Sequence, residues 1–457
     1  MSAAASRPQP CTERMSMSRP NILFIVADDL GYADLGCYGG RAADFGPVSP
    51  VLDRLAAGGL RLTQGYANSP VCSPTRFALA TARYQYRLRG AAEEPINSRT
   101  RGTPLGEKLG LPPDMPTVAS MLRDAGYRTA LIGKWHLGYP PHFGPLRSGY
   151  EEYFGPMSGG VDYFTHLSSS GQHDLWVGEE EHHDEGYLTD LLSQRSVDFV
   201  HRMAQGDAPF FLSLHYTAPH WPWETREDRS TAEALGAGIA HLDGGNIHQY
   251  RRMIHHMDEG IGWIVEALRA NGQLDNTLIV FTSDNGGERF SDNWPLVGGK
   301  MDLTEGGIRV PWIAHWPAVI APGRSSPQHC MSMDWSATVL DAAGVQAPEG
   351  HALDGISLLP VLRAEDAEFP RTLHWRMKHR GQRALRDGDW KYLRVDGIDY
   401  LFDLASDERE RANQAVRAPE RLAAMRSAWE DWNQGMPPIP EDATVSLVSS
   451  ARDMPQR

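Results

Sequence analysis

Short, uninterrupted apolar runs recur along the chain, separated by longer stretches in which apolar residues return every three or four positions. The first run is rich in β-branched residues and ends at two aspartates. The clearest runs occupy residues 21–27, 129–132, 210–215 and 277–282. Such runs are typical of strands buried on both faces of a sheet. Residues 247–268 show the helical spacing. Strands alternating with helices predict an α/β fold, with a large, mostly parallel sheet sandwiched by helices.

The pattern changes after about residue 362. Short strand-like segments joined by turns occupy residues 372–375, 383–385, 390–395 and 400–403, and residues 420–432 have helical spacing. This predicts a small C-terminal antiparallel sheet with one packed helix. We therefore predict a disordered tail at 1–19, a catalytic α/β domain at 20–362, a small α+β domain at 363–437 and a second tail at 438–457.

Charge and composition narrow the classes of partner. The chain has 457 residues, and its net charge of −14 disfavours binding to nucleic acid or to anionic lipid. The apolar run near the start, residues 22–27, is too short to cross a bilayer and too deep in the chain for a usual secretory signal. We therefore expect a cytoplasmic protein with no membrane partner. Its four cysteines (Cys11, Cys37, Cys72 and Cys330) are too few and too widely spaced for a disulfide framework or a zinc cluster.

Oxygen-bearing side chains follow two of the predicted strands. Asp28 and Asp29 end the first strand, and Asp284 and Asn285 end the fourth. In parallel sheets such residues gather in a crevice at the carboxyl ends of the strands. Carboxylate and amide oxygens are ligands that Ca²⁺ or Mg²⁺ prefers over zinc. Either pair taken alone could equally cap a turn or a helix.

The segment Val71-Cys72-Ser73-Pro74-Thr75-Arg76 offers a candidate nucleophile. Pro74 suits the first turn of a helix, which places Cys72 at the helix N-terminus, where the dipole favours an anion. A lone cysteine is more often a small buried apolar residue. The surrounding pattern decides between these two interpretations.

Cys-Ser-Pro-Thr-Arg resembles the C-x-P-x-R signature of the formylglycine-dependent sulfatases, members of the alkaline phosphatase superfamily. Further segments are similar to motifs of that family, in the expected order: residues 21–31, 133–138, 218–222, 283–286, 299–311, 386–391 and 401–404. The resemblance covers about residues 20–435. One departure is Thr81-Ala82-Arg83, where the family commonly has Thr-Gly-Arg.

The resemblance implies an alkaline-phosphatase-like fold and an arylsulfatase-like hydrolase of sulfate monoesters. Its nucleophile would be a hydrated formylglycine (3-oxoalanine), made from Cys72 by a formylglycine-generating enzyme. One divalent cation, Ca²⁺ in the first place with Mg²⁺ or Mn²⁺ as alternatives, would be held by residue 72 and the four oxygen ligands, Asp28, Asp29, Asp284 and Asn285. The resemblance also implies roles for five further residues: Arg76 and Lys134 hold the diol, His136 is the base, and Lys300 and His220 bind the sulfate and protonate the leaving oxygen. Lys134 is expected at the substrate as well.

Two other functions remain open at this point. One is a phosphonate monoester or phosphodiester hydrolase of the same superfamily, although such enzymes tend to carry histidine where this chain has Asn285. The other is a catalytically silent binding protein on the same fold. We expect the substrate to be a small sulfate ester; its identity and the oligomeric state do not follow from the sequence.

Overall fold

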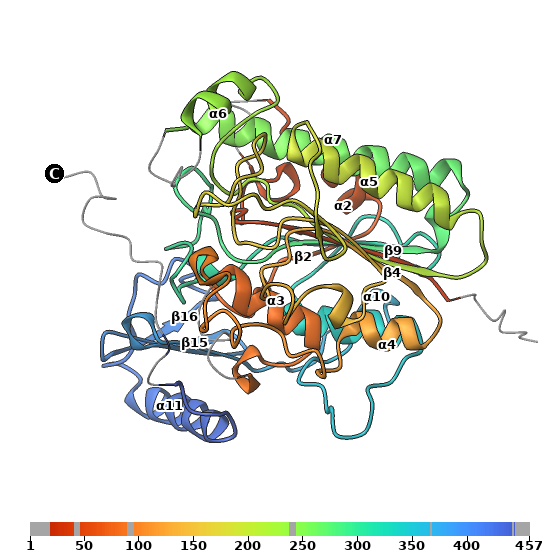
Figure 1. The fold of residues 1–457 in the computed structure, drawn as a ribbon. Coiled ribbons are helices and arrows are strands. Elements are labelled where there is room, and N and C mark those ends of the chain that lie inside the picture. The colour runs from red at the N-terminus through yellow and green to blue at the C-terminus, as the bar shows by residue number, and fades with distance from the viewer. Residues whose placement is uncertain are drawn as a thin grey trace, which may run out of the picture.

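A ten-stranded sheet forms the centre of the molecule (Figure 1). The computed structural model describes residues 19–40, 46–88, 96–236, 244–365, 368–440 and 443. The strand order is β11-β2-β10-β9-β1-β8-β4-β5-β6-β7, and the five strands from β9 to β5 are mutually parallel. The strands are β1 (Asn21–Ala27), β2 (Leu60–Leu62), β4 (Arg128–Gly133), β5 (Glu152–Gly155), β6 (Trp176–Val177), β7 (Glu180–Glu181), β8 (Phe210–His215), β9 (Thr277–Ser283), β10 (Trp312–His315) and β11 (Arg324–Ser326). A separate two-stranded ladder pairs β3 (Gly65–Tyr66) with β12 (Cys330–Met331).

Alternate residues of β1 enter two different cores. Ile22 and Phe24 belong to the core packed against α3, α4, α9 and α10, whereas Leu23 and Ile25 belong to the core under α2, α5 and α7. The two groups of helices lie on opposite faces of the sheet (Figure 1). The helices are α2 (Pro50–Ala57), α3 (Cys72–Thr81), α4 (Val118–Asp124), α5 (Leu188–Met203), α6 (Arg229–Leu235), α7 (Ile247–Ala270), α8 (Glu305–Ile308), α9 (Ser332–Ala342) and α10 (Leu359–Leu362). The predicted α/β fold, with helices on both faces of the sheet, is thus confirmed.

The long apolar runs mark the strands at the centre of the sheet. Strands β1 and β8 have the predicted bounds, and β4 and β9 extend beyond them by one residue at one or both ends. Toward the edges, β10 is antiparallel to β9 and β2, while β6 and β7 form an antiparallel extension beyond β5. These edge strands have two to four residues each. That is too short for a distinctive apolar pattern, so the sequence did not predict them.

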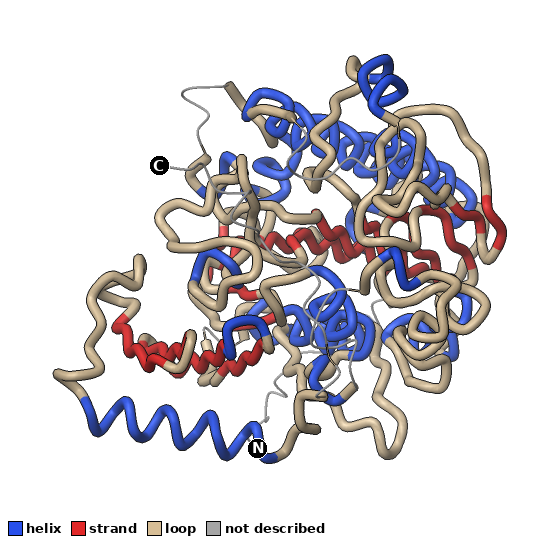
Figure 2. Tube along the Cα trace, turned by 60° about the vertical axis from the view of Figure 1, so that its left-hand side comes forward, coloured by secondary structure: helices blue, strands red, loops and turns tan. Residues whose placement is uncertain are grey.

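The C-terminal part contains a four-stranded antiparallel sheet with one helix on it, as predicted (Figure 2). It consists of β13 (Leu373–Met377), β14 (Gln382–Asp387), β15 (Trp390–Val395), β16 (Ile398–Asp403) and α11 (Pro419–Gln434). Met425 and Trp429 of α11 pack on one face of this sheet. The opposite face packs, through residues such as Trp375, against Tyr66 and Ile308 of the larger part. The small sheet is therefore enclosed between its own helix and the α/β part.

A group of buried charges, which we call the junction group, ties the two parts together. Glu305 at the start of α8 accepts bonds from Lys391 Nζ at 2.9 Å and from the hydroxyl of Tyr66 at 2.8 Å. Arg386 Nη1 lies 3.3 Å from the same carboxylate, and Lys391 also pairs with Glu410 at 2.8 Å. All of these side chains are nearly or fully buried. The stability of the junction therefore depends on the opposite charges and hydrogen bonds that these side chains offer one another.

The predicted tails, the predicted domain boundaries and the expected cytoplasmic location stay predictions. Residues 1–18 and most of the segment after 440 lie outside the described residues, and the domain boundaries at 362 and 437 are not tested. Among the helices of the described part, none is long and apolar enough to cross a membrane.

Candidate active site

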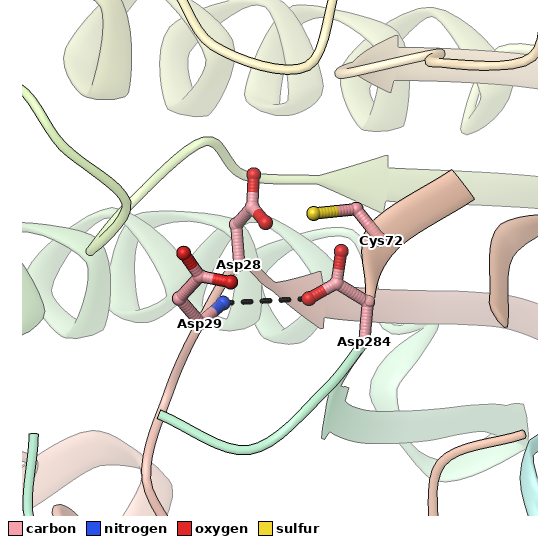
Figure 3. A group of neighbouring side chains, drawn as sticks. All are labelled: Asp28, Asp29, Cys72 and Asp284. Atoms are coloured by element: carbon pink, nitrogen blue, oxygen red, sulfur yellow. Dashed lines mark hydrogen bonds between the residues drawn. The ribbon is translucent and has the colours of Figure 1, made fainter. Parts of the chain in front are cut away.

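The site lies where β1 and β9 end side by side. The strands pair in register up to Ala27 and Ser283, so Asp28 and Asp284 are the next residues on each strand. The N–H of Asp284 donates to the carbonyl of Ala27 at 3.1 Å, and the N–H of Asp29 donates to Oδ1 of Asp284 at 3.3 Å (Figure 3). Asp29 has a left-handed backbone (φ 63°), which turns the chain sharply at the strand end. The three predicted carboxylates therefore converge.

Helix α3 brings Cys72 to the same place. Val71 is the extended N-cap residue, and Cys72 is the first residue of the helix. The preceding turn is held by the Thr75 hydroxyl, which accepts a hydrogen bond from the N–H of Ser69 at 3.0 Å and donates one to the Ser69 carbonyl at 3.0 Å. Helix α3 ends at Thr81, and the C-cap residue that follows, Ala82, has a left-handed φ of 55°. This explains the family's glycine at that position, because glycine adopts such a φ without steric cost.

The donor set fits a hard divalent cation. Ligating atoms of Asp28, Asp29, Cys72 and Asp284 all lie within 4.8 Å of one another, and all four side chains are buried (Figure 3). Oδ1 of Asp28 and Oδ1 of Asn285 receive no hydrogen bond from any described residue. The Asn285 amide nitrogen instead donates to Asp29 Oδ1 at 2.7 Å, which leaves the amide oxygen free. Buried acceptors without donors are costly, and a cation would satisfy them.

Each of the three carboxylates also pairs with a cationic side chain. Lys134 Nζ pairs with Asp28, Lys300 Nζ with Asp29 at 2.7 Å, and Arg76 with Asp284 at 2.8 Å. Burial alone would raise the pKa of Asp29, but Lys300, His220 and Lys134 lower it far below its usual value. Burial and the charge of Asp28 instead raise the pKa of Asp284 to about 6. The positive charge is therefore unevenly shared among the three carboxylates.

Two buried histidines stand beside the carboxylates. Nε2 of His136 lies 2.8 Å from the carbonyl oxygen of Ile96, and burial together with Lys134 lowers the pKa of His136 well below its usual value. Nδ1 of His220 lies 2.6 Å from the carbonyl oxygen of Trp221, and Nε2 lies 3.6 Å from Asp29. Burial and Lys300 lower the pKa of His220 to about 3. Both rings are therefore neutral near pH 7 in the absence of a bound anion.

A pocket of about 100 Å³ opens over these residues. Its lining includes four of the predicted site residues, Cys72, His136, His220 and Lys300, and seven others that lie mostly in loops: Ile96, Asn97, Ser98, Gly159, Gly160, Ser169 and Trp221. Of these, only Trp221 lies in a segment that the sequence analysis compared with a family motif, residues 218–222. A Cβ on Gly159 or Gly160 would fall 2.4 Å from His136 Cε1 or 2.9 Å from His220 Cε1, respectively. Both histidine rings thus rest against backbone.

Two acidic residues near the site had no sequence signal. Glu288 lies 3.8 Å from Lys300 Nζ, close to Asp29. Glu224, four residues after His220, accepts a hydrogen bond from the N–H of Tyr163 at 3.1 Å, and burial and the charge of nearby Asp162 raise the pKa of Glu224 to about 8. No described cation pairs with Glu224. With a pKa of about 8, Glu224 stays protonated near pH 7, which avoids placing a second negative charge beside Asp162.

Comparison with known proteins identifies the family to which this arrangement belongs. Residues 20–345, which hold every residue of the site, match the family model described as "Sulfatase". The chain belongs to the sulfatase family. It is an enzyme that hydrolyses sulfuric esters. Residues 299–425 also match the model "N-sulphoglucosamine sulphohydrolase, C-terminal", and this range holds the charged residues of the junction group and the small sheet.

Individual relatives and solved structures agree with this assignment. The sulfatase is 33% identical to human N-acetylgalactosamine-6-sulfatase over 79% of this chain and 67% of the relative, and thus spans about two thirds of its length. It is 32% identical to human arylsulfatase A over 88% of this chain and 80% of the relative. It also resembles the structure of "Ps i-CgsB in complex with k-i-k-neocarrahexaose", with TM-score 0.80 and 31% identity over 92% of this chain and 94% of the other.

Proposed function

We propose that this enzyme cleaves sulfate monoesters with a formylglycine made from Cys72 by a formylglycine-generating enzyme and with one bound Ca²⁺. The observation that carries the proposal is the convergence of Cys72 with Asp28, Asp29 and Asp284, beside acceptor oxygens that lack donors. An all-oxygen set favours Ca²⁺, with Mg²⁺ or Mn²⁺ as alternatives. When present, the hydrated formylglycine and the cation supply an acidified hydroxyl as nucleophile and positive charge for a sulfate oxygen.

The side chains around the centre have distinct tasks in this proposal. Arg76 and Lys134 fix Asp284 and Asp28 and neutralise part of their charge, and both help to hold residue 72. Lys134 also adds positive charge for the substrate. His136 accepts a proton from a hydroxyl of residue 72. Lys300, whose pKa stays well above its usual value because nearby acids outweigh its burial, meets the sulfate as a cation.

His220 would share the protonation of the leaving oxygen with Lys300. Its pKa of about 3 reflects burial and the adjacent Lys300. A sulfate bound next to the ring would raise that pKa, because an anion stabilises the imidazolium form. His220 would thus become a proton donor only when substrate is bound.

An unmodified Cys72 would be a poor nucleophile. Burial raises the pKa of its thiol far above the usual value, despite Lys134 and Lys300, and Asp28 and Asp284 add to the increase. Reactive cysteines show the opposite shift. This supports conversion of Cys72 to formylglycine over direct cysteine catalysis.

The proposal can be tested on the purified enzyme. Mass spectrometry of the tryptic peptide that contains residue 72 is expected to show loss of sulfur and gain of oxygen. Elemental analysis is expected to give one calcium per chain, with chelation abolishing activity. Unmodified cysteine in fully active protein, or stoichiometric zinc without calcium, magnesium or manganese, would contradict the proposal.

The diesterase alternative is tested by comparing matched substrates. A phosphodiester carries a second ester group where the sulfuryl site needs to hold only an oxygen. We expect kcat/KM for an aryl sulfate to exceed that for the matched aryl phosphodiester. The reverse order would favour the phosphodiesterase assignment and leave the metal and formylglycine assignments intact.

We further propose that the alcohol released is part of a carbohydrate. The described pocket wall offers an amide from Asn97, hydroxyls from Ser98 and Ser169, and the indole of Trp221, a lining that suits a neutral, hydroxyl-rich ring. The relatives named above include an N-acetylgalactosamine-6-sulfatase and a protein solved with a neocarrahexaose. A screen of hexose, N-acetylhexosamine and aryl sulfates tests this, and exclusive activity on aryl sulfates would oppose it.

A further inference from the structure

A chain of hydrogen bonds joins the helix of the nucleophile to the proposed base. Ser73, the residue after Cys72 in α3, is fully buried, and its hydroxyl oxygen accepts from the backbone N–H of Ile96 at 3.1 Å. The carbonyl oxygen of Ile96 lies 2.8 Å from Nε2 of His136. The two polar groups of one peptide residue thus connect the Ser73 hydroxyl to the imidazole.

This contact defines which nitrogen of His136 carries the proton. A backbone carbonyl can only accept, so Nε2 must be the protonated nitrogen and Nδ1 must carry the lone pair. Nδ1 is buried and has no hydrogen-bond partner among the described residues. A free lone pair in the wall of the pocket is the arrangement that a proton acceptor needs.

The ring is also held from two other sides. His136 has a left-handed backbone (φ 57°), a conformation that costs about 1–2 kcal/mol for a residue other than glycine. Its N–H donates to the carbonyl of Met157 at 3.0 Å, which helps maintain that conformation. The missing Cβ of Gly159 leaves space for the ring, since a Cβ there would lie 2.4 Å from Cε1 and 2.7 Å from Nε2.

We propose that Ser73 and Gly159 are positioning residues that make His136 present Nδ1, and not Nε2, to the hydroxyl of residue 72. Ser73 fixes the Ile96 carbonyl, the carbonyl fixes the tautomer, and Gly159 fixes the plane of the ring. The proton leaves the hydroxyl and arrives on Nδ1, and no other bond at His136 changes. The inference rests on the proposed function, because it requires His136 to be the base.

The first test removes one hydroxyl. In Ser73→Ala the Ile96 carbonyl loses its anchor, and we expect kcat to fall about ten- to a hundredfold, the size expected for a small misplacement of a catalytic group, with KM changed less than about twofold. Ser73→Thr keeps a hydroxyl and should recover most of kcat. Rates are normalised to the fraction of residue 72 that is modified, because Ser73 lies inside the modification signature.

Ser336→Ala is the matched control. Ser336 is also a buried serine whose hydroxyl holds α3, through a 2.7 Å bond to the carbonyl of Leu79. Its hydroxyl bonds only the carbonyls of Leu79 and Ser332 among the described residues, and we expect its removal to lower stability without the loss of kcat. An equal loss of kcat in both variants would show that Ser73 acts only by stabilising the helix, and would overturn the inference.

A double-mutant cycle separates positioning from other effects. Ser73→Ala should change kcat less than about twofold when added to His136→Ala, because its effect passes through His136. Gly159→Ala lies outside the modification signature and is expected to lower kcat in the same His136-dependent way. Full additivity in both cycles, or wild-type kcat in both single variants, would overturn the inference.

A direct reading of the tautomer completes the test. The ¹⁵N chemical shifts of His136, assigned by their absence in His136→Ala, should show protonated Nε2 in the wild type and a mixture of tautomers in Ser73→Ala. Protonated Nδ1 in the wild type would overturn the inference even in a fully active sulfatase. An inactive wild type with formylglycine and calcium in place would instead contradict the proposed function.

Discussion

The active site and the junction group both bury several charged side chains, and they compensate those charges in different ways. In the site, three carboxylates share three cationic side chains, and Arg76 pairs with Asp284 at 2.8 Å and with Asp28 at 3.9 Å. In the junction group, several donors converge on Glu305, including Lys391, Arg386 and Tyr66. Both groups lie beneath the surface, where an uncompensated charge is expensive.

The pKa values show what the difference means. At the junction, burial alone would raise the pKa of Glu305, but Lys391, Arg386 and Arg309 lower it to about 2. At the site, burial and Asp28 raise the pKa of Asp284 to about 6. Asp284, together with the Asp28 and Asn285 oxygens that receive no hydrogen bond, therefore suits the site to an added cation, whereas side chains of the fold already compensate Glu305. We conclude that the first group serves chemistry and the second holds the fold.

The largest effect should come from the nucleophile. Cys72→Ser cannot form the geminal diol, so we expect multiple-turnover activity to fall at least about a thousandfold. The free energy of unfolding should change by less than about 1 kcal/mol, because the two side chains are of similar size. Steady-state kinetics and urea unfolding measure the two quantities. Full turnover in the serine variant would show that the reaction does not require the geminal diol.

The junction group should respond in the opposite way. Lys391→Met leaves Glu305 and Glu410 buried without their shared cation, and we expect a loss of about 3–5 kcal/mol in the free energy of unfolding. Protein that remains folded should keep its kcat. Lys108→Met, at an exposed lysine, is the control and should change stability by less than about 0.5 kcal/mol. A large loss of kcat in folded Lys391→Met protein would show that the junction group also contributes to catalysis, and would contradict the separation of the two groups.

Calcium should stabilise the site and leave the junction unaffected. At a thousand times Kd, bound Ca²⁺ raises the free energy of unfolding by about 4 kcal/mol, because it binds the folded state alone. Thermal unfolding with calcium and with a chelator measures this shift. Asp284→Asn should lose most of it, and Lys391→Met should retain it. A calcium shift that survives in Asp284→Asn would place the ion elsewhere.

The pair of Asp162 and Glu224 gives a third, smaller test of charge compensation. The folded-state pKa of Glu224, about 8, exceeds its ordinary value of 4.5, so its stabilising proton is present at low pH and lost as pH rises through about 8. Between about pH 6 and pH 9 the wild type should lose about 2–3 kcal/mol that Glu224→Gln keeps, since glutamine is uncharged at both pH values. Urea unfolding at both pH values measures the difference, and parallel losses in the two proteins would contradict it.

How far the sequence could predict this molecule depended on the length of each pattern. Strand β1 could be predicted because six apolar residues in a row, 22–27, admit few other structures. Its register with β9 then placed Asp28 beside Asp284, which is why the ligand set followed from two strand ends. Strands β2 and β10 have three and four residues, and the sequence alone gave no reason to expect them.

The pocket wall and the supports of the site were beyond the sequence for a different reason. Ser98 begins a short 3-10 helix, and Gly159 and Ser169 lie in the long connection between β5 and β6. Nothing local distinguishes these pocket residues from other residues of such segments. Glu305 belongs to a recognised motif, but its partner Lys391 is 86 residues away. Contacts of this kind depend on tertiary packing, which local composition does not encode.

The register of β1 and β9 also fixes how far apart the two strand ends hold their ligands. Neighbouring strands lie about 4.8 Å apart, so two ligands that leave the sheet at matched positions start with about that separation. The ligating atoms of Asp28, Asp29, Cys72 and Asp284 lie within 4.8 Å of one another. The spacing of the backbone hydrogen bonds thus brings Asp28 and Asp284 within reach of a shared ligand, before the conformation of either side chain is considered.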